Sequence, residues 1–484
     1  MVNRRDFLNT AFGLAVSGPL SGHGPTPVSS NPDENKGKIL RASGLEFKEG
    51  DRPVKLRGVN LGGWMLLEDY MMGLPWTEWK IREQFRRVLG EKAYAAFFDA
   101  WADSYVAETD IEFLARKGFT FVRLPLNYRQ FESDLMPGQW HEEGFRLLDR
   151  AVALCRKYGL WILLDLHAAP GAQARDQNAG SAYGEAYLWY HRACMVRVAA
   201  FWREIARRYG NDAAVMGYNL LCEPVVSNAA LLNEFYASVI RAIREEDRDH
   251  LIVLDSNLWA KDVSSLRDPL FDDPQVIPAL HHYYFDDAFF PRLTRYPGKV
   301  DGRACNRAAL ERTLDGKHDQ KRISRPVLVG EFGVSRAHPQ PYAVQLAIGK
   351  DLVSVFEERG WGWALWCYKD IRHMGLLTPR SDTPWPRFLD SDPVAGFLKR
   401  YERIENPFAS AVGRLLADTD IETDIREQWA REVRRDFGPP ALDFVLRRLK
   451  DRSPAELAEM ARSFAFESCD IHEDQIRMMA PFIS

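Results

Sequence analysis

Two glutamates, Glu223 and Glu331, each stand directly after an apolar run with the composition of a β-strand. Pro224 follows the first, Phe332-Gly333 follows the second, and about three strand–helix units separate them. Two carboxyl groups can hydrolyse a glycosidic bond with retention of configuration when they lie about 5–5.5 Å apart. One attacks the anomeric carbon, while the other protonates the leaving oxygen and then deprotonates water. We expect Glu331 to be the nucleophile and Glu223 the acid/base.

The acid/base role places a demand on the surroundings of Glu223. Its pKa must lie near the working pH, a condition that a neighbouring carboxylate and partial burial provide. Taken alone, either glutamate would more often be a surface or ion-paired residue. Their joint position at strand ends favours the catalytic interpretation.

Other strand ends supply groups that would serve such a pair. Arg123 would keep a neighbouring carboxylate ionised, with a structural ion pair below the site as the alternative. His167 and His281 would hydrogen-bond sugar hydroxyls or the glutamates. A metal site built from histidine and glutamate is the competing hypothesis, but the spacing matches no metal motif. We therefore expect no metal and no cofactor.

Two aromatic residues complete the candidate set. Tyr283 could donate a hydrogen bond to the nucleophile, and Trp366 could stack on the apolar face of a sugar ring. The alternative is that both simply pack the top of the fold. The register of the run at 281–284 stays open, because His282 and Tyr284 fit the same pattern.

These side chains need a scaffold that brings strand ends together. From about residue 39 to 401 short apolar runs alternate with long amphipathic stretches, which is typical of βα units and a parallel sheet. The predicted strands are Val54–Asn60, Phe119–Leu124, Trp161–Leu166, Val215–Leu221, Leu251–Asp255, Val276–His281, Val327–Gly330 and Gly362–Trp366. Eight units predict an α/β fold, the (β/α)8 TIM barrel, whose strand ends converge on one mouth. A doubly wound sheet is the alternative, but the glycine-rich run at 57–63 lacks GxGxxG spacing.

The stretches between these strands have helical periodicity. The predicted helices include Glu143–Lys157, Met195–Tyr209, Leu231–Glu246 and Tyr342–Arg359. Glycines follow several such segments, namely Gly118, Gly159, Gly210 and Gly360. We expect each of them to end a helix in the left-handed conformation, which glycine adopts without strain.

At 484 residues the chain exceeds a typical barrel of about 250 residues, so further segments are expected. We divide it into a signal and linker at 1–38, the barrel at 39–405 and a helical C-terminal appendage at 406–484. The appendage is charged and has no strand signal, and Ser453-Pro454 predicts a capped helix start. Packing or partner docking is its expected role.

The run Asn3-Arg4-Arg5-Asp6-Phe7-Leu8 resembles a bacterial twin-arginine export signal. The apolar run that follows is too short and too rich in Gly and Ser to span a membrane stably. The segment predicts a periplasmic or secreted protein that the twin-arginine export machinery handles. A chance arginine pair before an apolar stretch is the alternative.

Composition narrows the classes of partner. A formal net charge of -4 and a pI near 6.3 argue against nucleic acid and other polyanions. The six cysteines show no CxxC or other metal spacing. We expect mostly free, buried thiols, with one or two disulfides as the alternative.

Taken together, the strand-end residues resemble the pattern of glycoside hydrolase family 5, the cellulase-like clan of retaining barrels. The pattern is met over about residues 50–400 by Arg123, His167, Glu223-Pro224, His281-His282-Tyr283, Glu331-Phe332-Gly333 and Trp366. The resemblance implies a TIM barrel and a retaining O-glycosyl hydrolase that cleaves β-linked glucan or gluco-oligosaccharide through a covalent glycosyl-enzyme.

Two segments resemble the exo-β-1,3-glucanase branch of that family. They are Leu56–Trp64 with Glu68, and His167–Gln173 with Asn178 and Gly180. The resemblance implies that Glu68 contacts the terminal glucose, that Asn178 belongs to the substrate-binding set, and that the substrate is a β-1,3- or β-1,4-linked glucan.

Two positions depart from the family pattern. Cys222 replaces the Asn before the acid/base, and Gln177 replaces an acidic residue, with Asp176 one place earlier. That Asn normally bonds the sugar 2-hydroxyl, and a thiol is a weak donor. Losing such a bond costs on the order of 1–3 kcal/mol, or roughly 10–150-fold in rate. A catalytically weakened, glycan-binding barrel is therefore the second hypothesis, and a β-mannan-active or transglycosylating enzyme is the third.

Overall fold

Eight parallel strands close into a barrel in the computed structural model, which describes residues 39–176, 178–181, 184–261, 263–318, 322–400 and 438–483. The strands are β4 (Arg57–Asn60), β5 (Phe121–Asn127), β8 (Trp161–Ala168), β9 (Val215–Asn219), β10 (Leu251–Asp255), β11 (Val276–His281), β14 (Leu328–Phe332) and β15 (Gly362–Leu365). They pair in chain order, and β15 closes the barrel on β4. The predicted (β/α)8 fold is confirmed.

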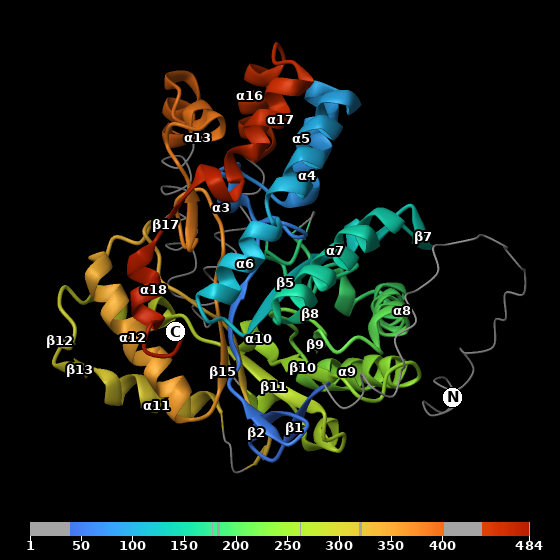
Figure 1. Ribbon diagram of the computed structural model, residues 1–484, viewed down its shortest axis with the longest axis vertical. Helices are drawn as coiled ribbons and strands as arrows, with labels where there is room; N and C mark the ends of the chain where they lie inside the picture. Colours follow the sequence, from blue (N-terminus) through green and yellow to red (C-terminus); the bar gives the residue numbers. More distant parts are fainter. Residues whose placement is uncertain are drawn as a thin grey trace, which may run out of the picture.

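Helices between consecutive strands surround the barrel (Figure 1). They are α6 (Glu108–Arg116), α7 (Glu142–Tyr158), α8 (Arg192–Tyr209), α9 (Ala229–Arg244), α11 (Arg307–Lys317) and α12 (Tyr342–Glu358). In α7 the residues at helical spacing, Phe145, Leu148, Val152 and Cys155, are buried against the barrel. No helix among the described residues is long and apolar enough to cross a membrane.

The predicted helix ends are correct except at one glycine. Gly118, Gly159 and Gly360 have φ of 82°, 71° and 70°, the left-handed conformation. Gly210 has φ −66° and ψ −4°, so the left-handed prediction is wrong there. A Cβ at Gly210 would lie 2.6 Å from the Ala206 carbonyl oxygen and 3.0 Å from Cβ of Asp247. Close packing, rather than a special φ, accounts for glycine at this position.

The predicted strand Val54–Asn60 is two strands with different partners. The first residue of the predicted strand, Val54, is the last residue of β3 (Arg52–Val54). The strand β3 pairs antiparallel with β2 (Glu46–Glu49), and β2 pairs antiparallel with β1 (Leu40–Ser43). Only β4 enters the barrel. The β1–β3 sheet packs Leu40 and Phe47 against apolar side chains at the amino ends of the barrel strands. It therefore closes the end of the barrel opposite the carboxyl ends of the strands.

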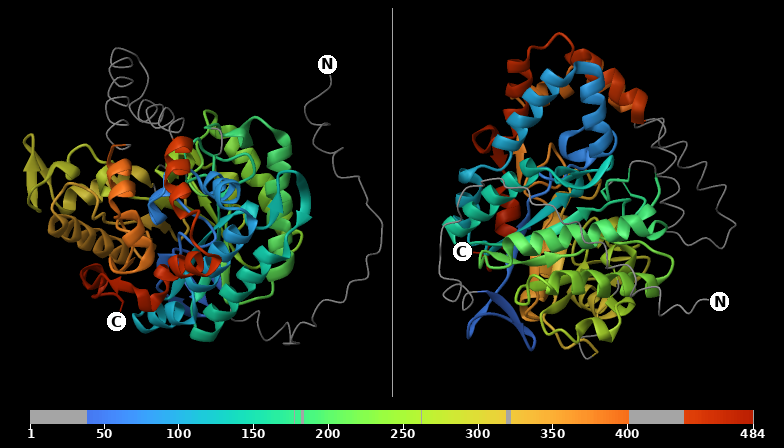
Figure 2. Two further views of the ribbon diagram at one scale, coloured as in Figure 1. Left: turned by 90° about the horizontal axis from the view of Figure 1, so that it is seen from above. Right: turned by 90° about the vertical axis from the view of Figure 1, so that its right-hand side faces the viewer.

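A helical insertion between β4 and α6 covers part of the mouth. It contains α3 (Asp69–Met72), α4 (Glu78–Leu89) and α5 (Glu91–Ser104). Figures 1 and 2 show α4 and α5 at one end of the barrel together with the red helices α16 (Gly438–Leu446) and α17 (Pro454–Ala461), opposite β1 and β2.

The described C-terminal residues pack partly onto this end of the barrel and partly against α12 at its side. They form α16 (Gly438–Leu446), α17 (Pro454–Ala461), β17 (Cys469–Ile471) and α18 (Glu473–Met479), which contact α4, α5, β16 (Leu377–Pro379) and α12. The predicted start of α17 is confirmed, since Ser453 and Glu456 form a capping box. The expectation of no strand is wrong, because β17 pairs antiparallel with β16. Its three residues are too few to leave a periodic signal.

Shorter elements fill the remaining connections. They are the strands β6 (Glu132–Ser133), β7 (Met136–Trp140), β12 (Gly298–Val300) and β13 (Arg303–Cys305), the helices α10 (Asn257–Ala260) and α13 (Pro384–Leu389), and the 3-10 turns Tyr128–Gln130, Tyr187–Trp189, Val263–Ser265, Asp268–Phe271, Tyr284–Asp286, Phe290–Arg292, Arg447–Leu449, Arg462–Phe464 and Phe466–Ser468.

Several expectations lie wholly or partly outside the described residues. They concern the twin-arginine-like signal and linker at 1–38, Gln177, and the first part of the C-terminal segment. All six cysteines are free, four of them buried, as predicted.

Candidate active site

Glu331 lies in β14 at the carboxyl end of the barrel and is 4% exposed. Its Oε1 accepts a hydrogen bond of 2.8 Å from Nη1 of Arg123, and its Oε2 accepts one of 2.8 Å from the Tyr283 hydroxyl. Burial raises the pKa of Glu331, but His281, Arg123 and His167 outweigh burial and lower it to about 2. The group is therefore a carboxylate at neutral pH.

Arg123 is held by side chains of the neighbouring strands and is fully buried in β5. Its Nε donates to Asn219 (3.0 Å), its Nη1 donates to Asn60 (2.9 Å), and its Nη2 lies 3.0 Å from a carboxylate oxygen of Asp165. These contacts fix the plane of the guanidinium, so that Nη1 faces the Glu331 carboxylate. The predicted position of Arg123 beside Glu331 is observed.

Glu223 follows β9 in a strained backbone conformation, with φ of 48°. Its backbone N–H donates to Asp255 (3.0 Å), which holds the turn in place. In its side chain, Oε1 lies 2.8 Å from Nδ1 of His281, and Oε2 accepts a bond of 3.0 Å from Asn178. Burial raises the pKa of Glu223, with a further rise from Glu331 that opposes the lowering by His281.

The two glutamates meet across the mouth. An oxygen of Glu223, an oxygen of Glu331 and a ring nitrogen of His281 lie within 4.8 Å of one another. One carboxyl group thus has a raised pKa and its neighbour a lowered pKa. This is the asymmetry that separate acid and nucleophile roles require.

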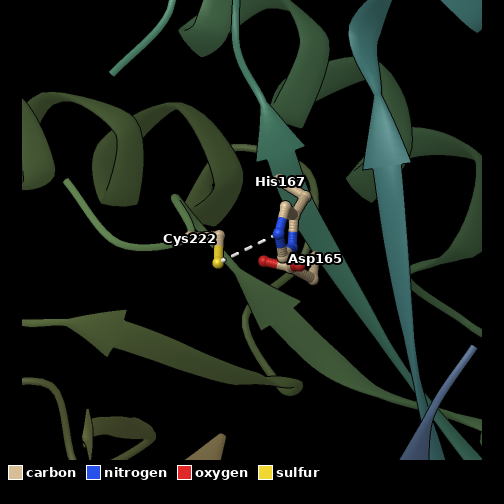
Figure 3. A group of neighbouring side chains, drawn as sticks. All are labelled: Asp165, His167 and Cys222. Atoms are coloured by element: carbon tan, nitrogen blue, oxygen red, sulfur yellow. Dashed lines mark hydrogen bonds and ion pairs between the residues drawn. The ribbon is translucent and has the colours of Figure 1, made fainter. Parts of the chain in front are cut away.

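His167 and Cys222 form a second group beside the glutamates (Figure 3). Nδ1 of His167 lies 2.8 Å from Asp165, and its Nε2 lies 3.6 Å from Sγ of Cys222 and 3.6 Å from Glu68. The thiol of Cys222 donates a long hydrogen bond of 3.6 Å to Oε1 of Glu331. Cys222 therefore faces the predicted nucleophile from the position that asparagine occupies in the family pattern.

Trp366 forms one wall of this site. Its indole stacks on the His167 ring with centroids 5.2 Å apart, and its Nε1 donates to the Tyr70 hydroxyl at 2.6 Å. Glu68, two residues before Tyr70, lies 3.6 Å from Nε2 of His167. Glu68 and Trp366 thus both contact His167.

The open register at 281–284 is resolved. His281, the last residue of β11, contacts Glu223, and Tyr283, two residues later, contacts Glu331. His282 is buried with neither ring nitrogen hydrogen-bonded, and Tyr284 packs edge-on against Phe285. His282 and Tyr284 therefore do not belong to the site.

Residues that the sequence prediction did not include also hold the site together, among them Asp165, Asp255 and Tyr70. Asp165 and Asp255 are carboxylates in otherwise apolar strands, and this was an available signal. Tyr70 comes from the helical insertion, and nothing local in the sequence links it to Trp366. Asp176 accepts a bond of 2.7 Å from Trp259, which gives it a partner other than the glutamates.

Residues 84–371 match the sequence model described as Cellulase (glycosyl hydrolase family 5). This chain belongs to glycosyl hydrolase family 5. The match covers more than half of the chain and includes both glutamates, so the protein is an O-glycosyl hydrolase of the cellulase-like type, as the sequence pattern predicted.

Named relatives of this family 5 chain differ in their activities. A β-xylosidase of Phanerodontia chrysosporium is 29% identical over 480 residues, covering 90% of this chain and 96% of the relative. Endoglucanase C of Acetivibrio thermocellus is 25% identical over 348 residues, covering 65% of this chain and 91% of the relative. A probable glucan 1,3-β-glucosidase A of Aspergillus clavatus is 28% identical over 292 residues, covering 57% and 64%.

Proposed function

We propose that this family 5 chain is a retaining β-glycoside hydrolase that cleaves β-linked glucan or gluco-oligosaccharide by double displacement. The observation that carries the proposal is the pair formed by Glu223 and Glu331. Their carboxylate oxygens lie within 4.8 Å, which suits direct attack on the sugar, whereas inverting enzymes separate the carboxyls by about 6.5–9.5 Å to admit a water.

The two half-reactions follow from the opposite pKa shifts. Glu331, ionised, attacks the anomeric carbon, and Glu223 gives its proton to the departing oxygen, leaving a glycosyl ester on Glu331. Glu223, now a carboxylate, takes a proton from water, which attacks the ester and frees Glu331. Arg123 and Tyr283 stabilise Glu331 as a leaving carboxylate through the hydrogen bonds described above.

The side chains beside the two glutamates are of the types that bind a sugar ring. Trp366 offers an aromatic face, and Glu68 and His167 offer hydrogen-bonding groups for hydroxyls beside the same wall. The glucanase and glucosidase names of relatives favour a β-glucan, and the glucan 1,3-β-glucosidase favours the β-1,3 linkage with attack at a chain end. The β-xylosidase places β-xylosides among the substrates to be tested.

The test compares wild type with Glu331→Ala and Glu223→Ala on aryl β-glucosides, aryl β-xylosides and β-1,3- and β-1,4-glucans. We expect both variants to lose hydrolysis of the glucans. With the aryl glycosides, azide should restore turnover by both variants. The product should be an α-glycosyl azide with Glu331→Ala and a β-glycosyl azide with Glu223→Ala. Unchanged hydrolysis by Glu331→Ala would overturn the proposal. Product analysis also separates hydrolysis from transglycosylation and reveals any action on β-mannan.

Cys222 supports a second candidate, a glycan-binding barrel with weakened catalysis. Its thiol occupies the place from which an amide would bond the sugar 2-hydroxyl, and it lies against Glu331 instead. Wild-type protein that binds oligosaccharide but releases no product from any tested glycan would favour this candidate over the first.

We also propose export by the twin-arginine route, on the strength of Arg4 and Arg5 before the apolar run. Replacing both with lysine should abolish accumulation of the protein outside the cytoplasm of a bacterial host. Equal export of the double variant would contradict this.

A further inference from the structure

Three consecutive residues of α10, directly after β10, adopt a left-handed backbone conformation. The φ angles of Leu258, Trp259 and Ala260 are 56°, 61° and 55°. None of the three is glycine, so each carries a steric cost that a right-handed turn would avoid. Strain of this kind persists only where surrounding contacts hold it, and it is concentrated at ligand-binding positions and active sites. The turn therefore indicates a function beyond connecting two elements.

Hydrogen bonds hold this turn against the loop that follows Glu223. The side chain of Asn257 accepts a bond of 2.9 Å from the backbone N–H of Val226 and donates one of 2.8 Å to its carbonyl oxygen. Ala260, at the end of the turn, is fully buried. Because Val226 comes only three residues after Glu223, α10 lies beside the loop that carries the acid/base.

The indole of Trp259 is tied to the loop that follows β8. Its Nε1 donates a hydrogen bond of 2.7 Å to the carboxylate of Asp176. Asp176 precedes Asn178 by two residues, and Asn178 donates to Oε2 of Glu223. The backbone and the side chain of this turn are thus both linked to segments that carry or contact the acid/base.

Lys261 connects the same turn to the loop that follows β11. Its Nζ lies 3.6 Å from a carboxylate oxygen of Asp286 and 5.1 Å from the centroid of the Trp259 ring. Asp286 comes three residues after Tyr283, which donates to Glu331. The turn is therefore linked to two loops that both reach the catalytic glutamates.

Trp259 is held in place without being fully covered. It is half-buried, and the preceding Leu258 is 46% exposed. Because Asp176 already accepts from the indole N–H, the indole offers apolar surface rather than a free donor. An aromatic surface of this kind can stack on the apolar face of a sugar ring. The position beside the acid/base decides which ring that is: the acid gives its proton to the departing oxygen, so the leaving group binds next to Glu223.

We propose that Trp259 is the platform for the leaving group, on which the first sugar ring beyond the cleaved bond stacks. This rests on the proposed function and adds a specificity-determining residue to it: the enzyme favours β-linked oligosaccharides over glycosides whose leaving group has no ring. Asp176 is a positioning residue, since its bond to Nε1 fixes the plane of the indole.

The test varies the leaving group and keeps the sugar that is transferred to Glu331 constant. For the full chain, kcat/KM is compared between β-glucosyl fluoride and laminaribiose or cellobiose, and between β-xylosyl fluoride and xylobiose. Trp259→Ala should lower kcat/KM for the disaccharides by about 10-fold or more and leave that for the fluorides within about 2-fold of wild type. Trp259→Phe, which keeps a ring, should recover most of the loss. Asp176→Ala should give a smaller loss, again confined to the disaccharides.

Trp140→Ala is the matched control, because Trp140 is another half-buried tryptophan, at the end of β7, where it packs edge-on against Phe145. It should leave kcat/KM for fluorides and disaccharides unchanged, and thermal unfolding checks that all variants are folded. Equal losses for fluorides and disaccharides in Trp259→Ala, or no loss for either, would overturn the proposal.

A binding measurement makes the result independent of turnover. In the Glu331→Ala background, calorimetry should show that Trp259→Ala weakens binding of the disaccharides about 10-fold and leaves binding of glucose or xylose unchanged. Equal weakening for both kinds of sugar would contradict the platform. Fluoride release by wild type that Glu331→Ala abolishes supports the proposed function whatever Trp259→Ala does, so failure of the platform and failure of the proposed function are distinguishable.

Discussion

Arg123 and Lys369 are two fully buried cations, and their ion pairs are built differently. At the catalytic centre Arg123 faces Asp165 and Glu331. Beside the described C-terminal residues, Nζ of Lys369 lies 2.6 Å from a carboxylate oxygen of Asp110. The same ammonium donates to the carbonyl oxygens of Tyr105 (2.6 Å) and Phe464 (2.9 Å). Each of the three N–H donors of Lys369 thus has an acceptor within the protein.

The Arg123 pair is open on one side. Its guanidinium is fixed by neighbouring strands, while the Glu331 carboxylate it contacts extends into the mouth beside Glu223. Both regions thus bury charged groups. A buried ion pair indicates a catalytic role only where one of its partners can still contact a substrate. The Lys369 pair joins the insertion, the loop after β15 and the C-terminal residues, so we assign it to stability.

The largest effect on activity is expected from Arg123→Met. Removing one partner of a buried pair costs about 3–5 kcal/mol, and here it leaves Glu331 and Asp165 without their counter-charge. The pKa of Glu331 should rise, and kcat/KM should fall on the order of 10²–10³-fold at neutral pH. Steady-state kinetics against the matched Arg123→Lys variant, which keeps the charge but loses the fork, measures this. If Arg123→Met kept nearly the wild-type kcat/KM, the Arg123 pair would have no catalytic role that distinguishes it from the Lys369 pair.

Cys222→Asn should act in the opposite direction. An amide at this position can donate to a sugar 2-hydroxyl, and a bond that forms fully in the transition state contributes about 1 kcal/mol or more, roughly 5–10-fold in kcat/KM. The comparison of glucosides with 2-deoxyglucosides isolates that bond, since the gain should vanish without the 2-hydroxyl. A fall in kcat/KM for glucosides would mean that the thiol is adapted to another substrate.

The pH profile reports the two carboxyl groups separately. Glu331 must be ionised, and its pKa lowered to about 2 keeps it so, which extends activity toward acid. Glu223 must be protonated in the first step, and its raised pKa extends activity toward alkali. With an activated aryl glycoside, Glu223→Gln should lose the alkaline limb of the kcat/KM profile and keep the acid limb. An unchanged alkaline limb would assign it to another group.

The smallest effect on activity is expected from Lys369→Met, although the loss of stability should be large. The variant leaves Asp110 buried without its counter-charge, at a cost of about 3–5 kcal/mol in the free energy of unfolding. Adding Asp110→Asn should recover part of this, because the amide oxygen can still accept from the Tyr368 hydroxyl that now bonds Asp110. Denaturant unfolding measures the stability, and kinetics below the unfolding transition measure kcat. A kcat loss as large as that of Arg123→Met would show that this pair also serves catalysis.

The barrel could be predicted from sequence because its strands are short apolar runs at regular spacing. Leu251–Asp255 and Val276–His281 were predicted with their observed limits, since both faces of these strands are buried. The split at Val54 was not predictable from apolar character, because β3 and β4 differ only in their partners. The strand β17 and the role of Tyr70 depend on residues far apart in the sequence.

The candidate site was predictable in part for the same reason. Residues at strand ends, such as Arg123 and Tyr283, follow from the barrel itself. The direction of the side chains does not follow from the barrel. His281 and His282 fit the sequence pattern equally well, and only the folded structure separates them, since His281 contacts Glu223 while neither ring nitrogen of His282 is hydrogen-bonded. The role of Asp255 depends on tertiary contacts with Glu223 and Asn219, which the sequence of its own apolar strand does not indicate.

The assignment of Glu331 as nucleophile is tested most directly by trapping the glycosyl-enzyme. A 2-deoxy-2-fluoro-β-glucosyl fluoride should form a slowly hydrolysed ester, and mass spectrometry of the digested protein should place one sugar on the peptide that contains Glu331. Glu331→Ala should take up no label. A label on another residue, or active enzyme that is never labelled and releases inverted product, would contradict the account.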